Sequence, residues 1–314
     1  MSLSAGPQAR RGRAEGALPG EALARIRFGT PAAGDDPREA CVPLSPIDAD
    51  FAELWLGQTL VSGGQDGAIA YTCDGHTLFG QLRLAADEAR DIERAAERAY
   101  RELLRVTRAR GYPHLLRAWN YFDGVTQGEG DAERYRRFCV GRRRAIDAPG
   151  YETSLPAATV IGSSAPGLWL CFFASRTPGA AVENPRQTSA YRYPRQYGPA
   201  SPSFARAMRI GSGLLVSGTA AIVGHETRHR GDVARQAEEM LANVLALLAR
   251  AEADGAPPLR ASLLRVYVRQ RDDAAQVASI VRTVLGADAA LAVLHGEVCR
   301  DDLLTEIEGV FTPA

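Results

Sequence analysis

Two glutamates near the C-terminus have the spacing of residues on one face of a β-strand. In the run 299–309, Cys-Arg-Asp-Asp-Leu-Leu-Thr-Glu-Ile-Glu-Gly, Glu306 and Glu308 alternate with Thr305 and Ile307, and alternate residues of a strand share a face. A carboxylate on an apolar face is costly to bury unless it is paired or protonated. Burial would raise its pKa and make it a usable general acid near neutral pH. The alternative is an edge strand with both carboxylates in water.

Arginine and tyrosine gather among prolines and glycines in segment 184–206, which contains four arginines and three tyrosines. An arginine can grip a carboxylate with a two-pronged fork, and a phenol can bond a hydroxyl. The segment is therefore a candidate site for a small carboxylated molecule, although its composition also fits an exposed linker. Arginine with aromatics can also bind single-stranded nucleic acid. We expect no nucleic-acid partner, because 37 basic residues balance 37 acidic residues.

The run His225-Glu-Thr-Arg-His229 matches the HExxH pattern, which binds zinc when it lies on a helix. Here it follows the strand-like run 214–224 and precedes a helix predicted to begin near Asp232. In a loop, the i,i+4 spacing does not bring two imidazoles together. We therefore predict a polar loop and no metal site.

Composition removes several classes of mechanism. All 37 basic residues among the 314 are arginine, so mechanisms based on a Schiff-base, pyridoxal-phosphate or Walker-A lysine are excluded. Five cysteines without CxxC spacing predict free thiols in the cytoplasm. No segment has the apolar length needed to cross a bilayer. Residues 1–40, rich in Ala, Gly, Arg and Pro, are predicted to form a flexible leader.

The elements that must position these residues occur twice in the same order. Each half has the pattern strand, long helix, strand, short helix, strand, strand. The long helices are expected at about 87–110 and 232–253, and Asp232 is a good N-cap. This pattern predicts an α+β fold of two units, each a mixed β-sheet with helices packed on one face. The expected units are residues 41–183 and 184–314.

The second half resembles the RidA/YjgF (chorismate-mutase-like) fold. The resemblance is carried by Ser217-Gly-Thr-Ala-Ala-Ile-Val-Gly-His225, the long helix after it, and the terminal Glu-Ile-Glu run. It implies two RidA/YjgF-like units. The imine-deaminase members carry a substrate-binding arginine about eight residues before the first glutamate of that run, where this chain has Val298. Imine deamination is therefore the weaker interpretation.

The chain resembles the chorismatases, which are longer bacterial enzymes, more closely than it resembles the RidA/YjgF proteins. This resemblance covers nearly the whole chain past residue 40. The matching segments are Asn120-Tyr121 with 133–142, 184–206, Ser217-Gly-Thr-Ala and 299–306. The resemblance implies cofactor-free cleavage of the enolpyruvyl ether of chorismate, with release of pyruvate. Glu306 would protonate the terminal methylene of the substrate as general acid.

The same resemblance implies the remaining site residues. Arginines are expected to bind the two substrate carboxylates with paired hydrogen bonds, and tyrosines are expected to contact the substrate hydroxyl. The expected substrate-binding residues are Arg142, Gln187, Tyr193, Arg195, Tyr197, Arg206 and Gly218. Cys299, seven residues before Glu306, resembles the type that forms 3-hydroxybenzoate and, in one group, also 4-hydroxybenzoate; the hydrolytic type, which forms a dihydroxycyclohexadienecarboxylate, has alanine there.

Two other interpretations stay open, an imine deaminase and a small-ligand binder of the same fold without catalysis. RidA proteins are trimers, and a chain with two repeats can fill neighbouring positions itself. The chain is therefore expected to be a monomer or a trimer.

Overall fold

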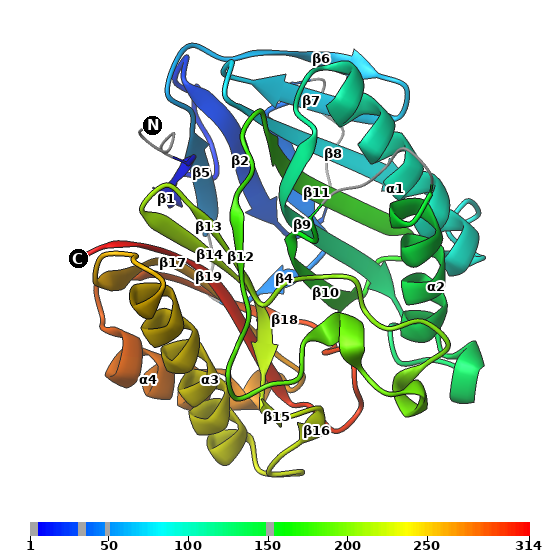
Figure 1. Ribbon diagram of the computed structural model, residues 1–314, viewed down its shortest axis with the longest axis vertical. Helices are drawn as coiled ribbons and strands as arrows, with labels where there is room; N and C mark the ends of the chain where they lie inside the picture. Colours follow the sequence, from blue (N-terminus) through cyan, green and yellow to red (C-terminus); the bar gives the residue numbers. More distant parts are fainter. Residues whose placement is uncertain (1–5, 31–35, 48–50, 149–153) are drawn as a thin grey trace.

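Two sheets with the same internal strand order form the frame of the molecule (Figure 1). The computed structural model describes residues 6–30, 36–47, 51–148 and 154–314. The first sheet has the order β10-β9-β11-β8-β7-β6. Its unit comprises β6 (Ser62–Asp66), β7 (Ile69–Cys73), β8 (Thr77–Leu84), α1 (Ile92–Ala109), β9 (His114–Asp123), α2 (Arg134–Ile146), β10 (Ala157–Ser163) and β11 (Leu168–Ser175).

The second sheet repeats this core, in the order β12-β13-β14-β19-β17-β18-β4. Its elements are β4 (Ser45–Pro46), β12 (Ala180–Val182), β13 (Ala207–Ile210), β14 (Gly213–Ala220), β15 (Ile222–Val223), β16 (Glu226–Thr227), α3 (Val233–Ala253), β17 (Leu259–Val268), α4 (Ala274–Leu285), β18 (Ala290–His295) and β19 (Thr305–Pro313). In each unit one parallel pair, β9 with β10 and β17 with β18, lies among antiparallel strands. The predicted α+β repeat is confirmed.

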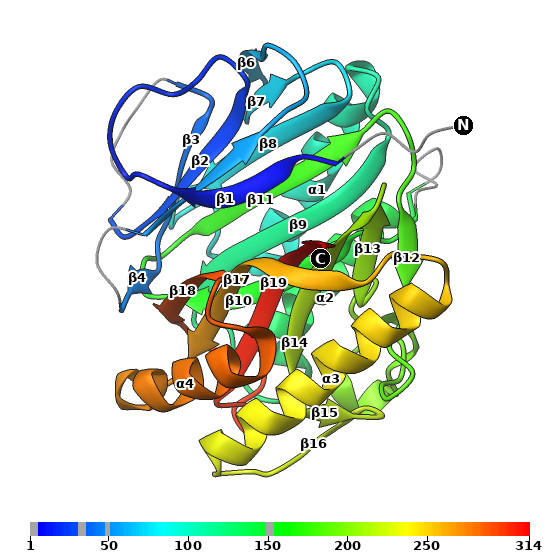
Figure 2. The ribbon, with the colours of Figure 1, turned by 90° about the vertical axis from the view of Figure 1, so that its left-hand side faces the viewer.

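Amphipathic helices cover one face of each sheet, α1 and α2 on the first and α3 and α4 on the second (Figures 1 and 2). The apolar stripe of α1, which includes Ala96, Ala99 and Leu103, is fully buried in the first core. Asp232 caps α3 as predicted, because its side chain accepts from the backbone N–H of Arg235 at 3.0 Å. None of the helices in the described ranges is long and apolar enough to span a membrane.

The predicted leader 1–40 is wrong wherever the structure describes it. β1 (Gln8–Gly12), β2 (Ala22–Phe28) and β3 (Glu39–Val42) form a third sheet with β5 (Ala52–Leu56), in the order β1-β5-β2-β3. These strands are short and rich in alanine and arginine, and their apolar side chains join a core with residues of both other sheets. Positions 1–5 and 31–35 of the predicted leader lie outside the described residues.

The predicted boundary between the units is also displaced. β12, at 180–182, and β4, at 45–46, both pair with strands of the second sheet, although both were assigned to the first unit. Neither strand is long enough to carry a periodic pattern.

Candidate active site

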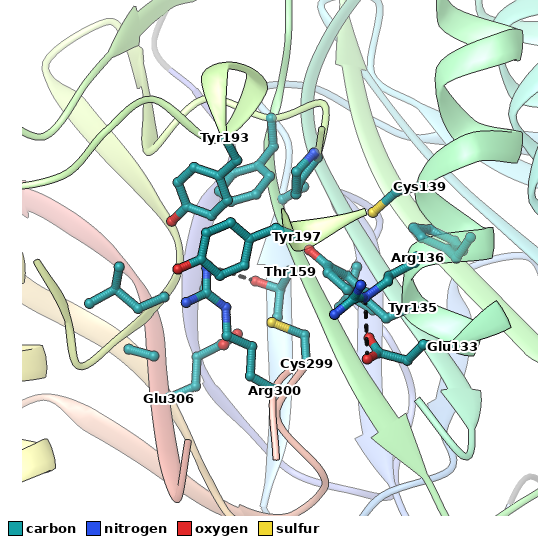
Figure 3. A pocket seen from close by; sticks show the side chains of 18 of the residues that line it. Glu133, Tyr135, Arg136, Cys139, Thr159, Tyr193, Tyr197, Cys299, Arg300 and Glu306 are labelled. Carbon is teal, nitrogen blue, oxygen red and sulfur yellow. Dashed lines mark hydrogen bonds and ion pairs between the residues drawn. The ribbon is translucent and has the colours of Figure 1, made fainter. Parts of the chain in front are cut away.

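A cavity of about 520 Å³ lies where the first and second units meet. Its walls come from α2, from β10, from the segment before β13, from β14 and from the connection between β18 and β19. In Figure 3, Glu133, Tyr135, Arg136 and Cys139 lie on one side of this space, and Tyr193, Tyr197 and Arg300 lie on the other. The cavity contains seven of the nine residues predicted from the sequence: Glu306, Cys299, Arg142, Tyr193, Tyr197, Arg206 and Gly218.

Glu306 is the buried carboxyl of this cavity. It stands on β19, a central strand between β14 and β17, and its side chain is 5% exposed. Among the described residues no hydrogen-bond partner faces it, so the carboxyl is available to a ligand. Burial raises its pKa to about 8, against the opposing effect of the guanidinium groups of Arg117 and Arg206. At neutral pH it keeps its proton and can act as a general acid.

Gly218 makes room for this carboxyl. A Cβ at position 218 would overlap a carboxyl oxygen of Glu306. The pairing of β14 with β19 shifts register between Val216 and Thr219, and this irregularity turns the backbone N–H of Gly218 toward the hydroxyl of Thr159, at 2.9 Å.

Two buried arginines with unpaired N–H groups belong to the cavity wall. Among the described residues, the Nε and Nη2 of Arg142 have no hydrogen-bond partner, and the guanidinium lies 4.8 Å from the ring centre of Tyr100. Arg206 donates to the hydroxyl of Tyr193 at 2.7 Å and to the carbonyl of Thr188 at 2.9 Å, while its Nε has no partner in the described chain. Orphaned guanidinium N–H groups favour an anionic ligand, because leaving them unpaired is costly.

Arg300 is a lining residue that the sequence analysis missed. Its guanidinium lies 4.1 Å from the ring centre of Tyr197 and 5.3 Å from that of Tyr193. It also donates to the carbonyl of His225 at 2.9 Å. The sequence feature that could have identified Arg300 as a site residue is its position directly after Cys299.

Two predicted ligands lie outside the cavity lining. Arg195 is exposed and forms an ion pair with Asp131, with bonds of 2.9 and 2.5 Å. Gln187 donates from Nε2 to the carbonyl of Ile222 at 3.0 Å, so it supports the cavity wall from behind. Arg195 and Gln187 both contact residues that are distant in sequence. The composition of the segment therefore could not show that these two lie outside the cavity while Arg206 and Tyr193 line it.

Cys299 lines the cavity as a neutral thiol. Burial raises its pKa to about 12, and the nearby Glu306 adds to the effect. A thiol of this kind is a small apolar wall rather than a nucleophile.

The HExxH run is not helical, as expected, but the predicted loop contains the two-residue strand β16 (Glu226–Thr227), which pairs with β15. His225 accepts or donates at Nδ1 with the hydroxyl of Tyr197, at 3.1 Å. His229 has a φ of 52° and its Nε2 lies 3.2 Å from Glu239. Within the described ranges no group of three or more His, Cys, Asp or Glu side chains is placed to hold a metal ion.

Comparison with known proteins gives relatives over the length of the chain. A sequence model of the family described as "Chorismatase FkbO/Hyg5-like, N-terminal" matches residues 53–174. A chorismatase of Streptomyces hygroscopicus is 38% identical over 293 aligned positions, and the match covers 87% of this chain and 83% of that protein. A 3-hydroxybenzoate synthase of the same organism is 36% identical over 286 aligned positions, and the match covers 85% of this chain and 83% of that protein. A crystal structure of a chorismatase superposes with a TM-score of 0.88 at 34% identity, covering 99% of both chains.

Proposed function

The chain belongs to the chorismatase family, and we propose that it converts chorismate to pyruvate and 3-hydroxybenzoate. The relatives support an enzyme acting on chorismate. The observation that carries the proposal is the Glu306 carboxyl, buried, unpartnered among the described residues and protonated at neutral pH. It faces a cavity whose wall includes two buried arginines, Arg142 and Arg206, with N–H groups unpaired in the described chain.

Each chemical step has a candidate residue. Arg142 and Arg206 bind the two carboxylates of chorismate, and Arg300, stacked on Tyr193 and Tyr197, is a third candidate. Glu306 gives its proton to the terminal methylene of the enolpyruvyl group, which becomes an oxocarbenium ion. The bond between the ring carbon and the ether oxygen then breaks, and pyruvate leaves with that oxygen as its ketone. The neighbouring ring hydroxyl moves to the vacated carbon, and a ring proton returns to the Glu306 carboxylate as the ring becomes aromatic. General acid catalysis of this kind contributes roughly 10²–10⁴-fold to the rate.

Cys299 supports 3-hydroxybenzoate as the aromatic product, since the hydrolytic members carry alanine at the corresponding position. One relative is itself named a 3-hydroxybenzoate synthase. The atoms of pyruvate and 3-hydroxybenzoate together equal those of chorismate, so this route consumes no water. The diene diol of the hydrolytic route takes up one water molecule. An apolar thiol, larger than the methyl group of alanine, disfavours a water molecule at that wall of the cavity. The competing products are the diol and 4-hydroxybenzoate.

The test is to incubate the purified protein with chorismate and to measure pyruvate and the ring products. We expect pyruvate and 3-hydroxybenzoate in equal amounts. Glu306→Gln should abolish turnover, whereas Glu238→Gln, the same change on the exposed face of α3, should not alter it. No pyruvate from the wild type would contradict the proposal. Diol without hydroxybenzoate would contradict the product, and Cys299→Ala should shift the ratio toward diol.

A further inference from the structure

We propose that a buried chain of charged side chains, which runs from the N-terminal sheet to the cavity, controls the proton affinity of Glu306. The chain joins four residues on four strands: Glu53 on β5, Arg265 on β17, Glu308 on β19 and Arg117 on β9. The inference rests on the proposed role of Glu306 as general acid. It adds positioning residues that do not themselves touch the substrate.

Arg265 is the centre of the chain. Its Nε and Nη2 donate to the two carboxylate oxygens of Glu53, each at 2.5 Å. Its Nη1 donates to Glu308 at 3.2 Å and to the hydroxyl of Tyr121 at 2.7 Å. Glu53 is 0% exposed and Arg265 2% exposed. This bidentate geometry in a buried site fixes both charges in place.

Arg117 and Thr159 connect the chain to the cavity. Arg117 forms an ion pair with Glu308, and it donates to the hydroxyl of Thr159 at 2.5 Å. The Thr159 hydroxyl in turn donates to Glu308 at 2.6 Å and accepts the backbone N–H of Gly218 at 2.9 Å. Gly218 is the residue against which the Glu306 carboxyl packs, and Thr159 itself lines the cavity.

The charges that face Glu306 come from separate elements. They are Arg117 from β9 and Arg206 from the segment before β13, while the titratable Cys299 faces it from the connection before β19. Burial lowers the pKa of Arg117 to about 9, so its guanidinium is still charged at neutral pH. That charge favours the carboxylate form of Glu306 and so opposes the effect of burial.

Glu308 limits how strongly Arg117 acts. The charge chain consists of two glutamates and two arginines, so its net charge is zero. Glu308 shares its carboxylate between Arg117 and Arg265. Without Arg117, only Arg206 would oppose the effect of burial, and Glu306 would hold its proton more tightly. With Arg117 unneutralised, Glu306 would lose its proton before the substrate arrives. The chain therefore balances the two tendencies.

The test uses two neutral substitutions with opposite expected effects. Glu308→Gln leaves Arg117 less neutralised, so the pKa of Glu306 should fall and the alkaline limb of the kcat–pH profile should move to lower pH. Arg117→Gln removes the positive charge, so the limb should move to higher pH. Each shift should be about one pH unit. Destabilisation alone would not move the limb in opposite directions.

A second readout does not depend on turnover. The infrared carbonyl band of a protonated buried carboxyl, identified by its loss in Glu306→Gln, should titrate with the same shifts. Glu53→Gln, remote from the cavity, should move the band in the direction of Glu308→Gln by a smaller amount. Glu238→Gln is the matched surface control. If a single variant does not fold, the double variant Arg117→Gln with Glu308→Gln removes both members of one ion pair of the charge chain, leaves only Arg206 to oppose the effect of burial on Glu306, and should raise the midpoint.

The outcomes separate the two proposals. No pyruvate from the wild type would overturn the proposed function, and pyruvate release by Glu306→Gln would overturn the role of Glu306 as general acid, on which the charge chain rests. Suppose that Glu306→Gln is inactive, but that the midpoints of the infrared band and of the rate do not move in the other variants or move in one direction only. This result would overturn the role of the charge chain and leave the proposed function standing.

Discussion

Glu306 and Glu308 are the same residue type, two positions apart on one strand, with opposite surroundings. Glu308 accepts from Arg265, Trp119 and Thr159, whereas Glu306 faces an open cavity. The strand alternation predicted that both carboxyls share a face. It did not reveal which one is paired, because the partners of Glu308 lie as far as 189 residues away. Pairs of carboxyls whose surroundings give them different proton affinities are typical of acid–base sites.

Glu306 makes the stability of the protein depend on pH in a defined direction. Its folded pKa of about 8 lies above the unfolded value of 4.5. The folded state thus keeps a proton that the unfolded state loses, and stability falls as pH rises from about 4.5 to about 8. Glu306→Gln, neutral throughout, escapes this loss. Its free energy of unfolding should equal that of the wild type near pH 4.5 and exceed it by on the order of a few kcal/mol at pH 8. Urea unfolding at both pH values measures this, and a constant difference would contradict the raised pKa.

Arg142 is expected to act on binding rather than on the chemical step. Its unpaired Nε and Nη2 would each form a charge-assisted hydrogen bond, worth about 1.5–3 kcal/mol. The amide of Arg142→Gln can replace one of these two bonds, so loss of the other should raise KM for chorismate roughly 10–100-fold with a smaller change in kcat. Arg250→Gln, which removes an exposed arginine paired with Asp254, is the control. An unchanged KM would exclude Arg142 as a carboxylate ligand.

At the scale of elements, the irregular end of β14 places Gly218 against the acid. Gly218→Ala would force its methyl into the Glu306 carboxyl, which must then rotate away from the cavity. We expect activity to fall by about 10²-fold or more, the range of general acid catalysis, while the protein stays folded. Gly213→Ala at the start of the same strand, where the nearest atom lies 3.3 Å from the added carbon, should retain activity. Pyruvate release and circular dichroism give the comparison.

Helix α3 holds the far end of the same wall. The side-chain N–H₂ of Asn243 donates to the carbonyls of Ala220 and Ile222, at 3.0 and 2.9 Å, and both of these residues line the cavity. In Asn243→Ala the carbonyl of Ile222 keeps its bond from Gln187, but the carbonyl of Ala220 loses its bond from Asn243, at a cost of about 1–3 kcal/mol. We expect a lower urea midpoint and reduced turnover. A variant with native stability and turnover would show that the helix does not shape the site.

The helical elements were the part of the fold that sequence periodicity could predict. The helix expected at about 87–110 lies at Ile92–Ala109, and that expected at 232–253 lies at Val233–Ala253. Long amphipathic stripes and a capping aspartate are local signals. Contacts such as the one between Asn243 and Ala220 depend on how the helix docks on the sheet, and no local pattern encodes them.

At the scale of the whole molecule, the repeat was visible in the sequence and the third sheet was not. Six elements recur in order in each unit, so the pattern is present twice. The N-terminal strands lack such redundancy, and the partner of β2, β5, lies about thirty residues further along the chain. An even longer separation in sequence hid the role of Glu53, which reaches Arg265 across 212 positions.

The N-terminal sheet is expected to unfold together with the two units rather than separately. Trp55 on β5 is 1% exposed and lies 5.6 Å from the ring of Trp119 and 4.8 Å from that of Phe173, both in the first sheet. It also donates from Nε1 to Glu53 at 3.0 Å, which ties it to the charge chain that reaches β17 and β19. A segment with these contacts shares its cooperativity with the rest of the core.

Trp55→Ala should lower the single calorimetric transition of the whole chain. Truncation of a buried tryptophan costs about 3–5 kcal/mol, which corresponds to a fall in Tm of roughly 5–10 °C for a protein of this size. Leu60→Ala removes an apolar side chain that is 81% exposed on the loop after β5 and should leave Tm within about 1 °C, because surface substitutions rarely change stability. If the strands around Trp55 were a leader independent of the two units, the main transition would stay in place in both variants, or a second, smaller transition would separate from it. We expect the single transition of Trp55→Ala to move to lower temperature as a whole, with the ratio of calorimetric to van't Hoff enthalpy unchanged. That result would show that the N-terminal sheet unfolds together with the sheets that carry the Glu53–Arg117 charge chain.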